Sequence, residues 1–529
     1  MDTEQNGIVR QKGTKLDTDR RFISWLLFAG LLLLYASTLT RQYYWDGIDF
    51  AQAIEDAPGL SAALFHPNHL IYNLFGYIVY HAFLAAGAHV RALTALQLTN
   101  CALAALTVLL FFRILLTCFN SLYLSLCLAL LCACSATWWR FATDADSYVV
   151  SVGLLLLCFR FLLPGRKPRP LSAALSHIAA ILFHQLAVFF APVVLLGLWQ
   201  QTAGQPRRAR LLVLVEYTIT AGGLTAIAYV AAFRLLTKSF ALPAFVRWLT
   251  NYSSEHGFSF APWADLVFSA RGHVRLFVEG RLSLLAGLMT PWLIALMALL
   301  AITALFLTYQ SLRTGRELIG LWRAHGPHAP ALSALRQLCW VWVLPYVAFL
   351  FFFIPQNTFY RLFYLPALLL LLGSWLAPVE ARPAHRHRYR LAALVATLAL
   401  SNLLFVIYPY TQVRNNPPLA LALALRQSWP PNTIIFIGSS NTDNRLCRYF
   451  NQGTIWRELD AQSVSDIAQE VRGAQGSGAP VWLEITAVDR VRSLPGGVDW
   501  LATYTTSTAH MELINSKYRL QFLRLNPVP

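Results

Sequence analysis

Apolar runs of about twenty residues recur along the chain from Phe22 to Ile407, and a helix of that length spans the hydrocarbon core of a bilayer. Only helices and closed barrels satisfy all of their backbone hydrogen bonds inside lipid. The composition agrees with a membrane location, because 57% of the 529 residues are hydrophobic, 13% are charged and the mean hydropathy is +0.49. The sequence therefore predicts a polytopic α-helical membrane protein.

The first apolar run, Phe22 to Leu39, differs from a secretory signal peptide. It continues into Thr40-Arg41-Gln42-Tyr43-Tyr44 without a small-residue cleavage site, so we expect an uncleaved first span. Seven of the eight cysteines lie in or beside apolar segments, and only Cys447 falls in the polar tail. Their spacing matches neither a disulfide framework nor a zinc site, which favours packing roles.

The net charge of +17 is carried almost entirely by the membrane part, because the chain from Pro409 onward has 11 basic and 9 acidic residues. Short basic loops of membrane proteins collect on the cytoplasmic side. The charge therefore indicates orientation, and we expect no nucleic-acid partner. The clusters predicted to be cytoplasmic are Arg10, Lys12, Lys15, Arg20 and Arg21; Arg166, Lys167 and Arg169; Arg207, Arg208 and Arg210; Arg313, Arg316 and Arg323; and Arg382, Arg386, Arg388 and Arg390.

These clusters decide how the helices are counted. A full span at Leu70 to Ala88 would place the Arg166 cluster outside, so we expect a juxtamembrane or re-entrant helix there. About eleven spans of a cell or inner membrane remain, with the N-terminus cytoplasmic and the tail periplasmic or extracellular. The predicted spans are residues 22–39, 92–116, 121–138, 147–163, 172–183, 186–199, 211–236, 282–308, 338–354, 362–377 and 391–408; the pair around His184 is either two broken helices or one long helix.

The domain plan follows from this count. Residues 1–21 form a cytoplasmic segment, and residues 22–408 a transmembrane domain with outward loops at 40–91 and 139–147. Residues 409–529 are predicted to form a small extracytoplasmic α/β domain, with strands at 433–437, 480–485 and 518–525 and helices at 444–450 and 464–471. The turn Gly438-Ser439-Ser440 suits a phosphate, but a glycine after a strand is common in any α/β unit.

Acidic residues in the outward loops are the most informative polar positions. Asp46 and Asp49 lie in Trp45-Asp46-Gly47-Ile48-Asp49-Phe50, and the turn His66-Pro67-Asn68-His69 follows. Asp144 and Asp146 lie in Thr143-Asp144-Ala145-Asp146-Ser147-Tyr148, in the next outward loop. Carboxylates beside a bilayer are costly, which favours chemistry over packing. Solvated or capping roles at helix ends are the alternatives.

These motifs, in this order, resemble the GT-C fold glycosyltransferases that use lipid-linked sugars, most closely the protein O-mannosyltransferase-like branch. Asn357-Thr358-Phe359-Tyr360-Arg361-Leu362-Phe363-Tyr364-Leu365-Pro366 is similar to the basic and aromatic start of a late span in that family. The resemblance covers roughly residues 20 to 408 by pattern and order. The chain has His66-Pro67-Asn68-His69 where many relatives have His-Pro-Pro, and this leaves the acceptor open.

The resemblance implies transfer of a sugar from a polyprenyl-phosphate donor to a glycan, lipid or protein acceptor. Such a reaction needs a base for the acceptor hydroxyl and a cation for the leaving phosphate. Asp46 is the predicted base, Asp49 lies on the same helical face to orient the acceptor or raise the pKa of the base, and Arg361 is the predicted phosphate partner. The predicted substrate-binding residues are His66, His69, Asp144, Asp146, Tyr360 and Arg361.

Other interpretations remain open at this stage. Arg361 is alternatively an interfacial anchor, and His66 and His69 lack a third ligand at a diagnostic metal spacing. No metal ligand or cofactor is therefore predicted, although a divalent cation stays open. A transporter or lipid flippase is the alternative function, with His184, Glu216 and the Gly222-Gly223 pair marking a polar pathway.

Overall fold

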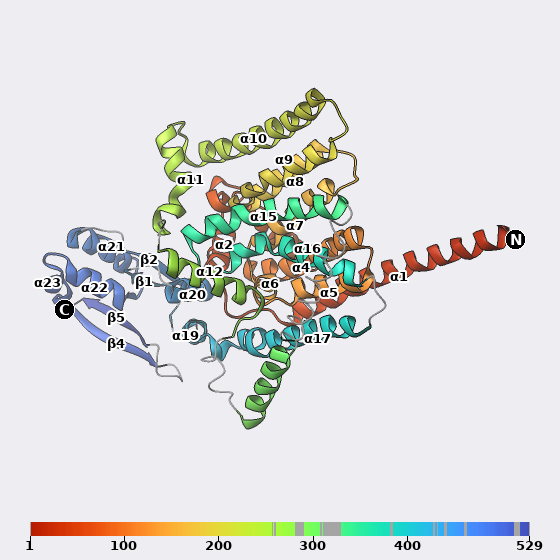
Figure 1. The fold of residues 1–529 in the computed structure, drawn as a ribbon. Coiled ribbons are helices and arrows are strands. Elements are labelled where there is room, and N and C mark those ends of the chain that lie inside the picture. The colour runs from red at the N-terminus through yellow and green to blue at the C-terminus, as the bar shows by residue number, and fades with distance from the viewer. Residues whose placement is uncertain are drawn as a thin grey trace. The chain divides into compact units, whose positions relative to one another are not determined.

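A computed structural model of the chain describes residues 2–256, 258, 261–280, 290–306, 309, 330–380, 385–426, 429–430, 432–438, 442–459, 463–512 and 519–527 (Figure 1). The chain divides into two compact units. The first unit comprises Met1–Thr40 and Ala53–Pro409, and the second comprises Arg41–Gln52 and Tyr410–Pro529. Helix α2 (Trp45–Asp56) crosses this division, so its acidic N-terminal part belongs with the C-terminal residues.

Among the described residues of the first unit, all regular secondary-structure elements are helices. Its α-helices are α1 (Asp2–Ser37), α3 (Tyr72–Ala85), α4 (Ala92–Phe119), α5 (Leu122–Ala133), α6 (Ala136–Ala142), α7 (Tyr148–Leu162), α8 (Pro170–Phe183), α9 (Ala191–Gln201), α10 (Arg207–Thr237), α11 (Leu242–His256), α12 (Pro262–Phe277), α15 (Pro330–Phe353), α16 (Leu365–Glu380) and α17 (His385–Asn402). Short 3-10 turns connect them at η1 (Ala62–Leu64), η2 (Pro67–His69), η3 (Gln185–Phe190) and η5 (Phe359–Phe363). After α17 come a π turn, η6 (Leu403–Ile407), and α18 (Tyr408–Tyr410).

Length and apolarity identify the helices that can cross a membrane. Among the described residues, five helices qualify by themselves, and a sixth candidate is the bent pair of α5 and α6. The five lie within α1, α4, α10 and α15 and across Tyr389–Tyr410. Shorter apolar helices lie at Tyr148–Leu162, Pro170–Phe183, Gln185–Gln201, Pro291–Phe306 and Leu365–Pro378. Apolar helices thus stand at the predicted spans, while the count of eleven stays a prediction.

Several predicted bounds need correction. The span predicted at 121–138 is bent by 67° between α5 and α6, because the helix is interrupted at Cys134 and Ser135. The predicted pair around His184 adopts the broken form: α8 ends at Phe183, His184 is extended, and η3 leads into α9. Helix α1 begins at Asp2, and its candidate membrane-spanning part, Arg20–Ser37, agrees with the predicted span 22–39. Residues 282–289 and 307–308 of the predicted span 282–308 lie outside the described residues.

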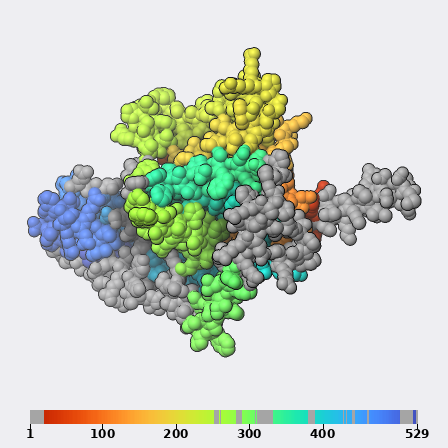
Figure 2. Space-filling model, in the orientation of Figure 1, coloured from red at the N-terminus to blue at the C-terminus, as the bar shows by residue number. Residues whose placement is uncertain are grey.

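Sequence reasoning missed α11 and α12, because both are amphipathic and too short or polar for a span. In α12, Asp265, Ser269 and Leu276 are buried, whereas Trp263 and Val274 are 81% and 65% exposed. The apolar face of α10 is also exposed, with Ile219 and Ile227 at 69% and 63%, and this helix forms part of the yellow surface at the top of Figure 2. Exposed apolar side chains of this kind are expected where a helix faces lipid.

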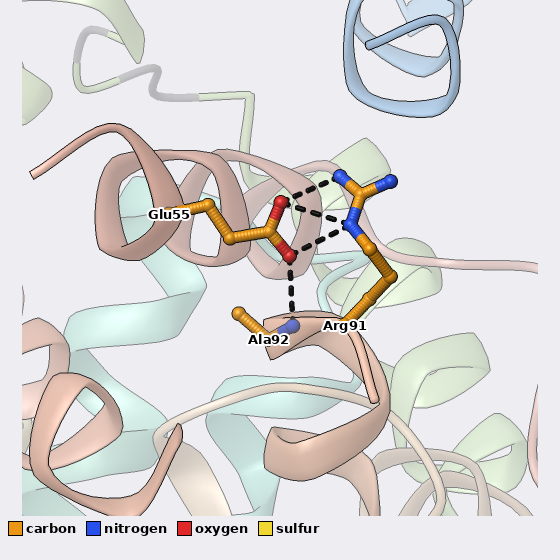
Figure 3. A network of polar contacts seen from close by, with 3 residues as sticks. All are labelled: Glu55, Arg91 and Ala92. Atoms are coloured by element: carbon orange, nitrogen blue, oxygen red, sulfur yellow. Dashed lines mark hydrogen bonds and ion pairs between the residues drawn. The ribbon is translucent and has the colours of Figure 1, made fainter. Parts of the chain in front are cut away.

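An ion pair fixes the start of α4 (Figure 3). The Glu55 carboxylate accepts hydrogen bonds from Arg91 Nε at 2.8 and 2.9 Å and from Arg91 Nη2 at 2.6 Å. The same carboxylate accepts a hydrogen bond from the Ala92 backbone N–H at 2.8 Å. Because the first N–H groups of a helix have no partner within it, Glu55 also acts as an N-terminal cap for α4.

The second unit contains a five-stranded sheet in the order β2-β1-β3-β5-β4. Strand β1 pairs in parallel with β2 and β3, and β5 pairs antiparallel with β3 and β4. The core includes Ile434, Phe436, Val471, Leu483 and Val488. The elements are η7 (Val413–Asn415), α19 (Pro417–Leu425), β1 (Thr433–Ile437), α20 (Thr442–Phe450), β2 (Thr454–Glu458), α21 (Val464–Gly476), β3 (Val481–Glu484), α22 (Ile485–Ser493), α23 (Gly497–Ala502), β4 (Tyr504–Glu512) and β5 (Arg519–Pro527).

The predicted α/β character of this unit is therefore confirmed, with β1, β3, β5 and α20 close to their predicted bounds. Helix α21 starts as predicted and continues beyond the predicted end at Val471 to Gly476. The missed strands β2 and β4 are the two edges of the sheet, where no continuous apolar run is needed. Gly438 follows β1, and a Cβ there would lie 2.1 Å from the Thr486 carbonyl oxygen, so close packing against α22 explains the glycine. Ser439 and Ser440 of the predicted phosphate turn lie outside the described residues.

Candidate functional site

Two amide side chains of α4 hold the acidic loop between α6 and α7. Asn100 Nδ2 donates to the carbonyl oxygens of Asp144 and Asp146 at 2.7 and 2.6 Å, and Gln97 Nε2 donates to those of Thr40 and Thr143 at 3.0 and 2.9 Å. Both amides are buried. Because a buried unpaired carbonyl is costly, these bonds make a compact loop stable inside the unit.

The Asp144 and Asp146 carboxylates lie inside this loop and are fully buried. Asp144 Oδ1 accepts a hydrogen bond from the Ala145 N–H at 2.9 Å, and Asp146 Oδ1 accepts one from the Ser147 N–H at 2.7 Å. Ser147 is the residue that precedes α7. The carboxylates thus shape the turn into α7, whereas the predicted contact with substrate stays a prediction.

His69, from the predicted His-Pro turn, joins this loop. His66 precedes η2 and Pro67 is its first residue, and His69 Nδ1 lies 2.7 Å from Ser147 Oγ. His69 is buried, while His66 is exposed. Burial, aided by the nearby His184 and His66, holds the pKa of His69 well below its ordinary value. His69 is therefore neutral near pH 7 and acts as a hydrogen-bonding group.

An aromatic cluster surrounds His69. The His69 ring centroid lies 4.7 Å from that of His184, and Tyr148 lies 5.0 Å from His184. The predicted substrate residue Tyr360 packs edge-on against both, at 5.7 Å from His184 and 5.9 Å from Tyr148. The structure thus brings together His66, His69, Tyr360 and the loop of Asp144 and Asp146. Among the described residues, no group of three or more His, Cys, Asp or Glu side chains is arranged to hold a metal ion.

Arg361, in η5, is fully buried. Its Nη1 donates to Tyr364 Oη at 2.6 Å, and its Nη2 donates to the Pro355 carbonyl oxygen at 2.6 Å and to Ser269 Oγ at 3.3 Å. All of these acceptors are neutral, and within the described part of the chain Arg361 has no carboxylate partner and its Nε has no hydrogen-bond acceptor. A buried cation without a counter-charge is costly, which is typical of a functional anion site.

Helix α12 provides the surface on which the guanidinium rests. A Cβ on Gly272 would lie 2.6 Å from Arg361 Nε and 2.8 Å from Nη2, so any larger residue here would require the guanidinium to shift. His273 Nδ1 donates to the Ser269 carbonyl oxygen at 2.8 Å, which leaves His273 Nε2 as an acceptor 3.0 Å from Tyr364 Oη. Burial, followed by the charge of Arg361, lowers the pKa of His273. Ser269, Gly272 and His273 were missed from the sequence, although a Gly-His pair on the polar face of an amphipathic helix is a usable signal.

The predicted catalytic pair lies in the second unit. Asp46 stands in the first turn of α2, and Asp49 Oδ2 lies 3.3 Å from Arg445 Nη1 of α20. Burial raises the pKa of Asp49 above its ordinary value, and the charges of Arg445 and Arg448 oppose this rise. The other six predicted site residues belong to the first unit.

Comparison with solved structures decides the fold. ArnT from Cupriavidus metallidurans bound to undecaprenyl phosphate matches with a TM-score of 0.58 at 12% identity, over 94% of this chain and 97% of that one. The apo form of the same protein matches with a TM-score of 0.55 at 11% identity, over 97% of this chain and 98% of that one. The chain has the GT-C fold.

This fold, together with the apolar helices, makes the chain a multi-pass membrane protein and confirms the fold that the motifs predicted. No family model and no curated protein matches the sequence. The O-mannosyltransferase-like branch stays a prediction.

Alanine at Gly272 tests whether α12 seats Arg361. We expect Gly272→Ala to lower stability by about 1 to 3 kcal/mol, because the new Cβ overlaps the guanidinium. Thermal unfolding in detergent measures this change. The matched control is Gly223→Ala on α10, where nothing lies within 4 Å and alanine is the better helix former.

A double variant identifies the cause. In Gly272→Ala/Arg361→Ala the overlapping side chain is gone, so the cost of the Gly272 change should largely disappear. Equal costs of Gly272→Ala with and without Arg361 would show that the guanidinium does not rest on α12.

Proposed function

We propose that the chain is a membrane glycosyltransferase that transfers a sugar from a polyprenyl-phosphate-linked donor to an acceptor on the extracytoplasmic face. The observation that carries this proposal is the buried Arg361 guanidinium, which has only neutral partners among the described residues. A solved protein of the same fold is bound to undecaprenyl phosphate. A planar guanidinium matches phosphate oxygens in a bidentate manner, so a phosphate would supply the missing charge.

Arg361 is the proposed donor-phosphate residue. Its guanidinium is fully buried here, so a phosphate reaches it only after surrounding side chains move. The guanidinium is held by hydrogen bonds to Tyr364, His273 and Ser269. These neutral groups orient the guanidinium without neutralising its charge. Such preorganisation favours stabilisation of charge that develops on a leaving phosphate.

Asp46 is the proposed base for the acceptor hydroxyl, and Asp49, one turn later, orients the acceptor or adjusts the pKa of that base. His66, His69 and Tyr360 are proposed substrate contacts. The burial of Asp144 and Asp146 favours an effect on substrate through the loop that they shape.

The structure gives the transporter alternative no support. Glu216 is exposed on α10, and a Cβ added to Gly222 or Gly223 would have no other group within 4 Å. His184, by contrast, is buried among aromatic rings. These residues therefore do not line a common polar pathway.

The proposed orientation places the N-terminus in the cytoplasm and residues 409–529 outside it, in a cell or inner membrane. We expect a reporter fused after Pro529 to be active only outside the cytoplasm, and one inserted at Arg386 only inside it. Paired reporters of opposite compartment requirement measure this directly. A cytoplasmic C-terminus would contradict both the orientation and the proposed face of the reaction.

Replacing Asp46 tests the proposed base. Asp46→Asn keeps the side-chain size and removes proton abstraction, so transfer should fall by roughly a hundredfold or more. The rate of sugar transfer in detergent or liposomes is the measurement, with membrane abundance unchanged. Asp489→Asn, which removes an exposed carboxylate of α22, is the control. Loss of activity in Asp49→Asn with near-normal activity in Asp46→Asn would exchange the two roles.

Replacing Arg361 tests the donor site. Arg361→Lys should weaken donor use, and Arg361→Ala should weaken it further, by about 2 to 4 kcal/mol, because a lysine point charge cannot grip phosphate bidentately. Transfer rate against donor concentration measures this, and acceptor dependence should change far less. Because Arg361 is buried, the thermal midpoint of each variant is measured alongside. An unchanged donor dependence in folded Arg361→Ala would leave this arginine a structural residue only.

A further inference from the structure

The acidic segment of the first outward loop is held by residues near the C-terminus. The Arg41 N–H donates to the Tyr410 carbonyl oxygen at 2.7 Å, and Asn416 Nδ2 donates to the Arg41 carbonyl oxygen at 2.7 Å. Gln42 Nε2 donates to the Asn415 carbonyl oxygen. Two consecutive residues that precede α2 therefore form hydrogen bonds with the segment from Tyr410 to Asn416, which contains η7 and leads into α19.

Helix α20 holds the next part of the same segment. The Tyr43 ring stacks on Phe450 with centroids 6.1 Å apart. Arg445 lies with its Cζ 5.7 Å from the centroid of the Trp45 ring, and its Nη1 lies 3.3 Å from Asp49 Oδ2. Trp45 and Asp49 are four residues apart on α2 and so lie on one face, with Asp46 beside Trp45. One arginine thus contacts both ends of the turn that contains Asp46.

Helix α20 is itself firmly placed. Leu446, Cys447 and Tyr449 are buried, and Asn451 Nδ2 at its end donates to the Ala422 carbonyl oxygen of α19 at 3.1 Å. Asn416 caps α19 through its Oδ1, which accepts from the Leu419 N–H at 3.3 Å, while its Nδ2 holds Arg41. Arg445 is therefore presented from a fixed helix.

We propose that Arg445 is a positioning residue for the catalytic turn of α2, so that α20 takes part in placing the proposed base. The proposal rests on the proposed function, because it takes Asp46 as the base. Arg445 compensates the charge of Asp49, so that Asp46 is not crowded by a second uncompensated carboxylate one turn away. Its cation–π contact with Trp45 sets the rotation of the helix about its axis.

A surface ion pair with no role in positioning α2 predicts something different. The Arg445 and Asp49 side chains are 27% and 44% exposed, and ion pairs this exposed contribute little to stability. If the ion pair had no positioning role, its loss would change neither the rate of transfer nor the amide hydrogen exchange of α2.

The test compares Arg445→Ala and Arg445→Lys with Arg492→Ala, which breaks a more exposed arginine–aspartate pair of the same unit, to Asp489. Full-length protein in detergent is used, with kcat and donor KM as one readout. The other readout is amide hydrogen exchange of residues 45–52. We expect kcat of Arg445→Ala to fall roughly tenfold or more with donor KM unchanged, because a misplaced base costs rate rather than donor binding. Arg445→Lys should keep part of the rate, and Arg492→Ala all of it.

Exchange over residues 45–52 should become faster in Arg445→Ala and stay unchanged in Arg492→Ala. Unchanged exchange in Arg445→Ala would overturn the proposal, and so would faster exchange with an unchanged kcat, since the contact would then be structural only. The exchange readout needs no substrate. If the wild-type protein transferred no sugar, the proposed function would fail on the activity assay, while exchange would still report whether Arg445 holds α2.

Discussion

Burial of charge in an apolar helical unit is the constraint on which the rest of this structure depends. Arg361 has no exposed surface, and its hydrogen-bond partners in the described residues are neutral. A stabilising network would normally place a carboxylate beside such a group, because an uncompensated buried ion costs several kcal/mol. The unit instead surrounds it with hydroxyl, carbonyl and imidazole groups and keeps a glycine beneath it. The arrangement is costly for folding, and this cost supports the proposal that Arg361 binds an anion.

The acidic loop of Asp144 and Asp146 accommodates buried charge in a different way. Its carboxylates are also fully buried, but neighbouring N–H groups and the α4 amides satisfy the loop from within. It serves as a rigid support for Ser147, and through Ser147 for His69. The loop carboxylates thus accept hydrogen bonds from backbone N–H groups within their own loop, whereas the Arg361 guanidinium donates to neutral groups of other elements.

The sequence was informative where one-dimensional pattern carries the physics. Apolar run length predicted α4, α7 and α10 closely, since a helix in lipid must be long and apolar. The continuous apolar run of β1 likewise marked a central strand. The edge strand β2 and the amphipathic α12 were missed, because most of their residues are exposed and their apolar pattern is weak. The break at Cys134 and Ser135 has no proline or glycine to announce it.

In the candidate site, too, the sequence indicated some features and only the structure showed the others. The sequence by itself supplied the His-Pro turn and the short motifs whose resemblance to GT-C glycosyltransferases implied the fold, because each of these lies within a short stretch of chain. The base and the phosphate partner stay predictions. Only the tertiary structure decided which residues meet: Gly272 beneath Arg361, Ser147 beside His69, and Arg445 on Asp49. Arg445 and Asp49 are almost four hundred residues apart, so no local pattern relates them. Such contacts arise when whole helices and strands pack together. This packing decides which charges are compensated and which side chains are buried, and no short stretch of sequence carries that information.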